Sequence, residues 1–74
     1  MDLRTLFIEK SGKDNLYQAV QYLKDYLGVA PATLNNWVYG RNRPKLDLFR
    51  LREMLNRLEV SFEEFCDAVE KSHS

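Results

Sequence analysis

Large apolar residues recur every three or four positions along most of this chain, which is the spacing of one face of an α-helix. The clearest stripe is Leu16, Val20, Leu23 and Leu27. It is followed by Gly28, a residue that adopts the left-handed conformation common at helix ends. No useful stretch shows the strict alternation of a β-strand. The pattern therefore predicts an all-α fold.

Capping residues divide the chain into five short helices. Side chains able to accept a backbone N–H at a helix start stand at four places: Asp2, Asn15, Asp47 and the capping-box pair Ser61 and Glu64. Pro31 suits the first turn of a further helix, because its missing N–H would have no partner there. Gly12 and Gly28 end the first two helices, and the basic, proline-containing residues 40–45 are typical of a loop. We expect residues 71–74 to fray.

The length of 74 residues indicates one domain. Such a domain buries only about 60% of the surface of its unfolded chain, so nearly every large apolar residue is expected in the core. The core stripes expected in the first, third, fourth and fifth helices are Leu3, Leu6 and Phe7; Leu34, Trp37 and Val38; Leu48, Phe49, Leu51, Met54, Leu55 and Leu58; and Phe62, Phe65, Cys66 and Val69. We therefore expect a compact bundle of about five short helices, one domain over residues 1–74 with its core in residues 2–70.

Composition argues against several classes of protein. The one cysteine, Cys66, cannot form an intramolecular disulfide, and with one histidine, His73, the chain offers no metal-ligand cluster and no catalytic constellation. We expect no enzymatic activity, metal, cofactor or small-molecule ligand. No apolar run reaches the roughly 20 residues that span a bilayer, and the first residues lack the features of a signal peptide. These features predict a cytoplasmic protein.

Residues 20–40 have the order of elements of a helix-turn-helix. A helix ends at Gly28, a tight turn follows, and a second short helix presents small and polar side chains away from its apolar face. The residues expected to hold the two helices together are Leu23, Leu27, Val29, Leu34 and Trp37. In DNA-binding proteins this motif places its second helix in the major groove.

Several short pieces follow one another in a characteristic order: Leu27-Gly28-Val29, Thr33-Leu34, Trp37, Gly40, Arg43-Pro44 and Leu58-Glu59-Val60-Ser61. In this order, residues 16–69 resemble the Cro and phage-repressor type, or lambda-repressor-like, helix-turn-helix family. The chain departs from the family pattern at Lys24, where the family has a small residue, and at Ala30, where it has a capping Ser or Thr. The resemblance implies a sequence-specific regulator of the phage, prophage or mobile-element type that binds double-stranded DNA on the nucleoid. A repressor that blocks polymerase is the expected form, and activation by contact with polymerase is the alternative.

The resemblance assigns base contacts to the first turns of the second motif helix, at Pro31, Ala32, Thr33 and Asn36. The Asn36 amide can form a bidentate pair with an adenine edge, which is worth roughly 1–3 kcal/mol of discrimination. The methyl groups of Ala32 and Thr33 can contact a thymine methyl. A solvated helix face without a ligand is the alternative interpretation of these polar residues.

Phosphate contacts are expected from residues on and after the same helix: Asn35, Tyr39, Arg41, Asn42, Arg43 and Lys45. Such contacts set the position of the protein on DNA without reading sequence. Arg50 and Arg52 either extend the basic patch or pair with Asp47 or Glu53 across a helical turn. The alternative interpretation of the basic loop is that its side chains are solvated and bind no phosphate.

One recognition helix contacts too few base pairs to be selective in a genome, so the resemblance implies a homodimer. Its operator would be near-palindromic, with half-sites about one helical turn apart. The expected dimer surface comprises Val60, Phe62, Phe65 and Val69, with Phe62 or Phe65 exposed.

The formal net charge is zero, but the charges are unevenly distributed. Residues 1–52 carry nine basic and five acidic side chains, a net of +4, and residues 53–74 carry a net of −4. We expect the positive part to face DNA and the negative part to face away. The neutral total and three tyrosines of the second helix, Tyr17, Tyr22 and Tyr26, leave another interpretation open. In it the chain is a protein-interaction module, adaptor or antitoxin-like, without DNA binding.

Overall fold

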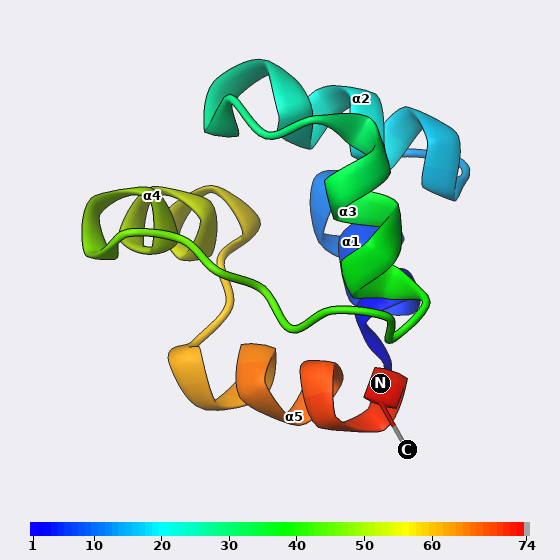
Figure 1. The fold of residues 1–74 in the computed structure, drawn as a ribbon. Helices are drawn as coiled ribbons and strands as arrows, with labels where there is room; N and C mark the ends of the chain where they lie inside the picture. Colours follow the sequence, from blue (N-terminus) through cyan, green and yellow to red (C-terminus); the bar gives the residue numbers. More distant parts are fainter. Residues whose placement is uncertain (74) are drawn as a thin grey trace.

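The structure is a computed structural model that describes residues 1–73, apart from the side chain of Tyr26. Five helices follow one another along the chain: α1 (Leu3–Ser11), α2 (Leu16–Leu27), α3 (Pro31–Val38), α4 (Leu48–Leu58) and α5 (Phe62–His73). The described residues contain no β-strand. The predicted all-α bundle of five short helices is therefore confirmed (Figure 1).

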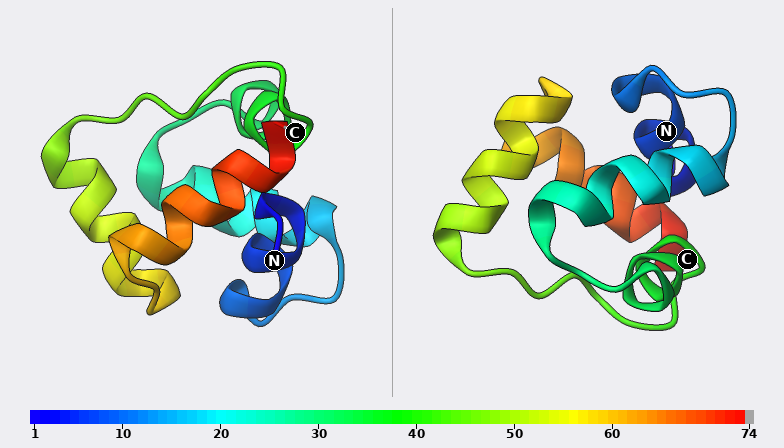
Figure 2. Two further views of the ribbon diagram at one scale, coloured as in Figure 1. Left: turned by 90° about the horizontal axis from the view of Figure 1, so that it is seen from below. Right: turned by 90° about the horizontal axis from the view of Figure 1, so that it is seen from above.

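Helix α1 packs against each of the other four helices. Figures 1 and 2 show α3 and α4 on opposite sides of the molecule, joined by a long connection, while α5 runs from the end of α4 back towards α3. Among the described residues, no helix has both the length and the apolar character needed to cross a membrane. The arrangement leaves one side of α3 and the connection after it on the surface.

The predicted helix starts are confirmed by their hydrogen bonds. The side chains of Asp2, Asn15 and Asp47 accept backbone N–H groups of the residues three positions later, at 2.8 to 2.9 Å. At the start of α5, the Ser61 hydroxyl accepts from the Glu64 N–H, and the Glu64 carboxylate accepts from the Ser61 N–H. These local contacts define where the helices begin, because they satisfy backbone donors that have no partner within the helix.

The Asp2 cap makes the stability of the fold depend on pH. The backbone N–H of Thr5 binds the Asp2 carboxylate and holds its pKa below the ordinary value of 3.8. The ionised Asp2 carboxylate therefore contributes to the free energy of unfolding. This contribution is complete above the ordinary pKa of Asp2, and it is lost as the pH falls through the lower pKa that Asp2 has in the folded state. In denaturant titrations from neutral pH to about pH 3, we expect Asp2→Asn, which keeps an accepting oxygen, to lose less stability than the wild type. Asp2→Ala should cost about 1 kcal/mol at neutral pH. Parallel pH profiles of wild type and Asp2→Asn would contradict this role for the carboxylate.

The core contains apolar side chains from all five helices and from the turn before α5. Its members are Leu3, Leu6, Phe7, Leu16, Ala19, Val20, Leu23, Leu27, Leu34, Trp37, Val38, Met54, Leu58, Val60, Phe65, Ala68 and Val69. Cys66 is half-buried. Most of the predicted stripes are thus confirmed, including the place of Trp37 in the core, but the stripe of α5 is wrong at Phe62, which is exposed.

The predicted core stripe of α4 is wrong at its first turn. The exposed fractions are 80% for Leu48 and 74% for Phe49. Helix α4 packs against α1 and α2, and its buried residues are Met54 and Leu58. Phe49 lies nine residues before Leu58, which places it on the opposite side of the helix. The N-terminal end of α4 therefore presents two large apolar side chains to solvent.

The expected fraying of the C-terminal residues is wrong for residues 71–73, which continue α5. Ser74 lies outside the described residues. The Ser72 hydroxyl accepts a hydrogen bond from the Leu3 N–H at 2.9 Å and so ties the end of α5 to the start of α1. Gly40, with a φ of +73°, approaches the same turn so closely that an added Cβ would collide with the Ser72 carbonyl oxygen. Residues from three distant parts of the chain thus meet at this end of α5.

Candidate nucleic-acid interface

Helices α2 and α3 are joined by three residues and pack against each other. Gly28 ends α2 with a φ of +66°, and its N–H donates to the Lys24 carbonyl at 3.0 Å. A Cβ at Gly28 would meet no neighbouring atom, so the turn needs this glycine for its backbone conformation and not for space.

The residues predicted to hold α2 and α3 together do lie on their inner sides. Leu23, Leu27, Leu34 and Trp37 are buried, and Val29 packs against them while half-buried. Of the two departures from the family pattern, Lys24 is half-buried, and Ala30 precedes α3 without a side-chain cap. The Ala30 carbonyl nevertheless accepts the N–H groups of Thr33 and Leu34, and Pro31 occupies the first turn. Helix α3 therefore starts at the expected residue.

The four predicted base-contacting residues lie on one exposed stretch of α3. Ala32 and Thr33 are exposed, whereas Pro31 and Asn36 are half-buried. Their small side chains leave the backbone of α3 accessible from outside. Such a surface suits close approach to the edges of base pairs.

Most of the predicted phosphate-contacting residues are exposed: Tyr39, Arg41, Asn42, Arg43 and Lys45. The sixth, Asn35, is half-buried. The turn after α3 is closed by the Asn36 carbonyl, which accepts the N–H groups of Arg41 at 2.9 Å and Asn42 at 3.4 Å. The structure therefore holds the start of the loop beside the last turn of α3, whereas Arg43 turns towards α5 and the rest of the loop leads away to α4 (Figure 1).

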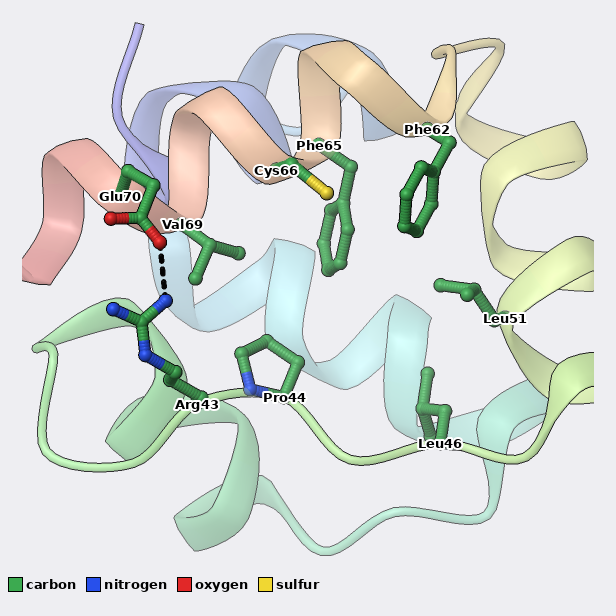
Figure 3. A pocket seen from close by; sticks show the side chains of 9 residues that line it. All are labelled: Arg43, Pro44, Leu46, Leu51, Phe62, Phe65, Cys66, Val69 and Glu70. Atoms are coloured by element: carbon green, nitrogen blue, oxygen red, sulfur yellow. Dashed lines mark hydrogen bonds and ion pairs between the residues drawn. The ribbon is translucent and has the colours of Figure 1, made fainter.

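Arg43 forms an ion pair with Glu70 of α5 (Figure 3). The hydrogen bond from Arg43 lowers the pKa of Glu70, and the same pairing raises the pKa of Arg43. Both side chains are largely exposed, so the pair is screened by solvent and salt. The negative C-terminal part, which is predicted to face away from DNA, thus contributes Glu70 to a contact with the predicted phosphate-binding loop, because α5 returns beside that loop (Figure 3).

A groove of about 230 Å³ lies between this loop and helices α4 and α5. Figure 3 shows the side chains of the loop facing those of the two helices across it. Its lining residues are Arg43, Pro44, Leu46, Leu51, Phe62, Phe65, Cys66, Val69 and Glu70. The groove is thus mainly apolar, and the Arg43–Glu70 ion pair lies at one end.

The predicted dimer surface needs correction. Val60, Phe65 and Val69 are buried, because α5 uses its apolar stripe to pack against α1 and α3. The exposed fraction of Phe62 is 57%, so it is the predicted member that can contact a partner. Leu48 and Phe49, which were expected in the core, are also exposed. We call Leu48, Phe49 and Phe62 the α4–α5 patch.

Two residues beside the candidate interface were not predicted. Arg4 and Gln18 line an open hollow together with Asn15, Tyr17, Asn35 and Tyr39, where the start of α2 meets α3. The cap at Asn15 could have identified Gln18 as a first-turn residue near this surface. Nothing local could have identified Arg4, because it comes from α1 and reaches the hollow only through the packing of the bundle.

Comparison of this chain with models of protein families, with curated protein sequences and with solved structures finds no match.

Proposed function

We propose that this protein is a sequence-specific DNA-binding transcriptional regulator, a repressor of the phage type, in which α2 and α3 act as a helix-turn-helix. The observation that supports the proposal is that Arg41, the first cationic residue of the loop, is held beside Asn36 on α3. Small and amide side chains on α3 can approach base edges, and the cationic loop beside them can bind phosphates. Both kinds of contact are needed to bind DNA and to read its sequence.

The outer side of α3 is the base-reading element in this proposal. Ala32 and Thr33 offer methyl groups to thymine, and Asn36 offers an amide that can hydrogen-bond a base. Pro31 fixes the start of the helix without blocking its approach. Because no side chain longer than Asn precedes Tyr39 on this side, α3 can enter the major groove deeply.

Phosphate contacts position α3 in the groove. Arg41 supplies positive charge at the end of α3, and Arg43 and Lys45 supply it along the loop that follows. At the other side of the helix, Arg4 lines the same hollow as the start of α2, where the positive end of the helix dipole favours an anion. The two sets of donors would bind the phosphates that flank one major groove.

The proposed regulator acts as a homodimer through the α4–α5 patch. The exposed apolar side chains of this patch and the apolar groove that Phe62 also lines can complement each other about a two-fold axis. Arg50 already pairs with Asp47 at 3.5 Å, as one of the predicted alternatives had it. Arg52 on α4 and acidic Glu63 and Asp67 on α5 would attract each other between copies. The molecule is 28 Å long, and α3 lies on the side away from α4. Two copies joined at α4 could therefore hold their α3 helices about one DNA turn, roughly 34 Å, apart.

Repression would follow from occupation of an operator that overlaps a promoter, and the protein would act in the cytoplasm on the nucleoid. The exposed apolar patch also suits the other interpretation, a protein-interaction module. The DNA-binding regulator and the protein-interaction module differ in whether the cationic loop binds DNA.

The test is the salt dependence of binding to a mixed-sequence DNA duplex. Arg43→Ala should weaken binding and lower the slope of log affinity against log salt by about one unit, because one phosphate contact is lost. Lys10→Ala is the matched control, since it removes one exposed positive charge from the last turn of α1. Glu70→Gln should strengthen binding, because it releases Arg43 and removes a negative charge beside it.

The proposal is contradicted if Arg43→Ala and Lys10→Ala change the slope equally. It is also contradicted if the wild type shows no salt-dependent binding to DNA. In the second case the protein-interaction module becomes the better interpretation of the fold.

A further inference from the structure

We infer that Arg41 and Asn36 form one base-reading unit, and that this unit favours guanine over adenine at the base pair it faces. The inference rests on the proposed function and specifies what the proposed recognition helix reads. It gives Arg41 a role other than the phosphate contact expected from its place in a basic loop.

The two side chains are held together by the turn that follows α3. The Asn36 carbonyl accepts the Arg41 N–H at 2.9 Å, which fixes the Arg41 backbone beside the last turn of the helix. Gly40 allows this turn with its φ of +73°. The Arg41 guanidinium then donates from Nη1 to Asn36 Oδ1 at 3.3 Å. It also lies over the Tyr39 ring, with Cζ 5.3 Å from the ring centroid. Three neighbouring contacts thus direct Arg41 back towards α3.

This pairing determines which way the Asn36 amide faces. A guanidinium has only donors, so the amide atom that faces it is the oxygen. The Nδ2 group of Asn36, with two N–H donors, is therefore the part left for another partner. The remaining N–H groups of Arg41 are also donors. The unit as a whole presents donors to whatever approaches it.

Guanine matches this arrangement better than adenine does. In the major groove guanine presents two acceptors, N7 and O6, whereas adenine presents the N7 acceptor and the N6 amino donor. The bidentate pair of an isolated asparagine with adenine needs Oδ1 to accept from N6. In this structure Arg41 occupies one of the two lone pairs of Oδ1, and an adenine amino group that approached the other would lie against the remaining N–H donors of the guanidinium. Exclusion of water at a DNA interface would strengthen the hydrogen bonds to the guanine acceptors. It would also increase the cost of placing the adenine amino group against the donors of Arg41 and Asn36.

Arg43 and Lys45 remain for phosphate contacts under this inference. Neither has a described hydrogen bond to α3, and Arg43 points instead to Glu70. Within the loop, Arg41 therefore takes part in base recognition, whereas Arg43 and Lys45 bind phosphates and so position the protein on DNA.

The experiment compares operator duplexes that differ at single base pairs. The operator is first selected from a random pool with the wild type, and affinities are then measured for all four base pairs at each half-site position. The wild type should prefer guanine at one position per half-site. Arg41→Met keeps the length of the side chain but removes its donors, so it should shift that position towards adenine by about tenfold. Arg43→Met is the matched control and should weaken all duplexes alike.

The inference is overturned if Arg41→Met, like Arg43→Met, weakens every duplex equally, because Arg41 would then be a phosphate contact. A wild-type preference for adenine at the position that Asn36 controls would overturn it as well. In both cases DNA binding persists and the proposed function stands. If the wild type binds no duplex, the proposed function fails and the inference fails with it.

Discussion

Gly40→Ala should destabilise the protein by about 2–5 kcal/mol, a large part of the total stability of a domain this small. Two effects combine at this position. An alanine at a φ of +73° is strained, and its Cβ would collide with the Ser72 carbonyl oxygen in the last turn of α5. Because this contact is with backbone, relief requires movement of α5 or of the turn after α3. The loss should be visible as a lower midpoint in urea denaturation.

Gly12→Ala is the matched control for this effect. Gly12 has the same φ of +73°, but a Cβ there meets no atom within 4 Å. The Gly12→Ala variant should therefore lose only the stability that corresponds to the strained backbone conformation, about 1–2 kcal/mol. Equal destabilisation by the two substitutions would show that the approach of Gly40 to Ser72 contributes nothing.

Asn36→Ala is the substitution expected to change sequence recognition most. It should cost about 1–3 kcal/mol at each half-site of the selected operator, and the cost doubles in a dimer because both copies lose the contact. Binding to mixed-sequence DNA should change little, since the loop and its charges are retained. The measurement is a competition gel-shift assay with operator and mixed-sequence duplexes.

Asn35→Ala provides the comparison, because it removes the same side chain from the neighbouring position. Asn35 lines the hollow with Arg4 and Tyr39, and its proposed role is a phosphate contact. Its loss should weaken operator and mixed-sequence DNA to the same degree. If Asn36→Ala behaves in this way too, α3 does not read bases through Asn36.

The helices were predictable because their signals are local. Asp2, Asn15 and Asp47 act on N–H groups three residues away, and the spacing of leucines identifies the inner side of each helix. The turn at Gly28 was predictable for the same reason. Local patterns of this kind need no knowledge of how helices pack together.

Features that depend on packing were not predictable. The Leu3–Ser72 hydrogen bond joins residues 69 positions apart, and the Arg43–Glu70 pair joins residues 27 apart. The exposure of Leu48 also depends on packing, because the buried residues of α4, Met54 and Leu58, lie in its later turns. Phe49 is different, because its position opposite Leu58 follows from helical spacing alone.

The candidate site was partly predictable. The sequence indicated which residues stand on the outer side of α3 and in the basic loop, and the structure holds Arg41 and Asn42 of the loop beside Asn36. It did not indicate that Arg41 folds back to Asn36 or that α5 supplies a partner for Arg43. Both contacts depend on side-chain directions that spacing alone does not determine.

Selection of bound sequences from a random pool of DNA duplexes tests most directly whether α3 of a homodimer reads DNA. The wild-type protein should enrich sites made of two inverted half-sites whose centres lie about 10 base pairs apart. The affinity for the enriched sites should fall steeply as salt rises. A bound pool with the same sequence composition as the input would contradict sequence-specific DNA recognition by this protein.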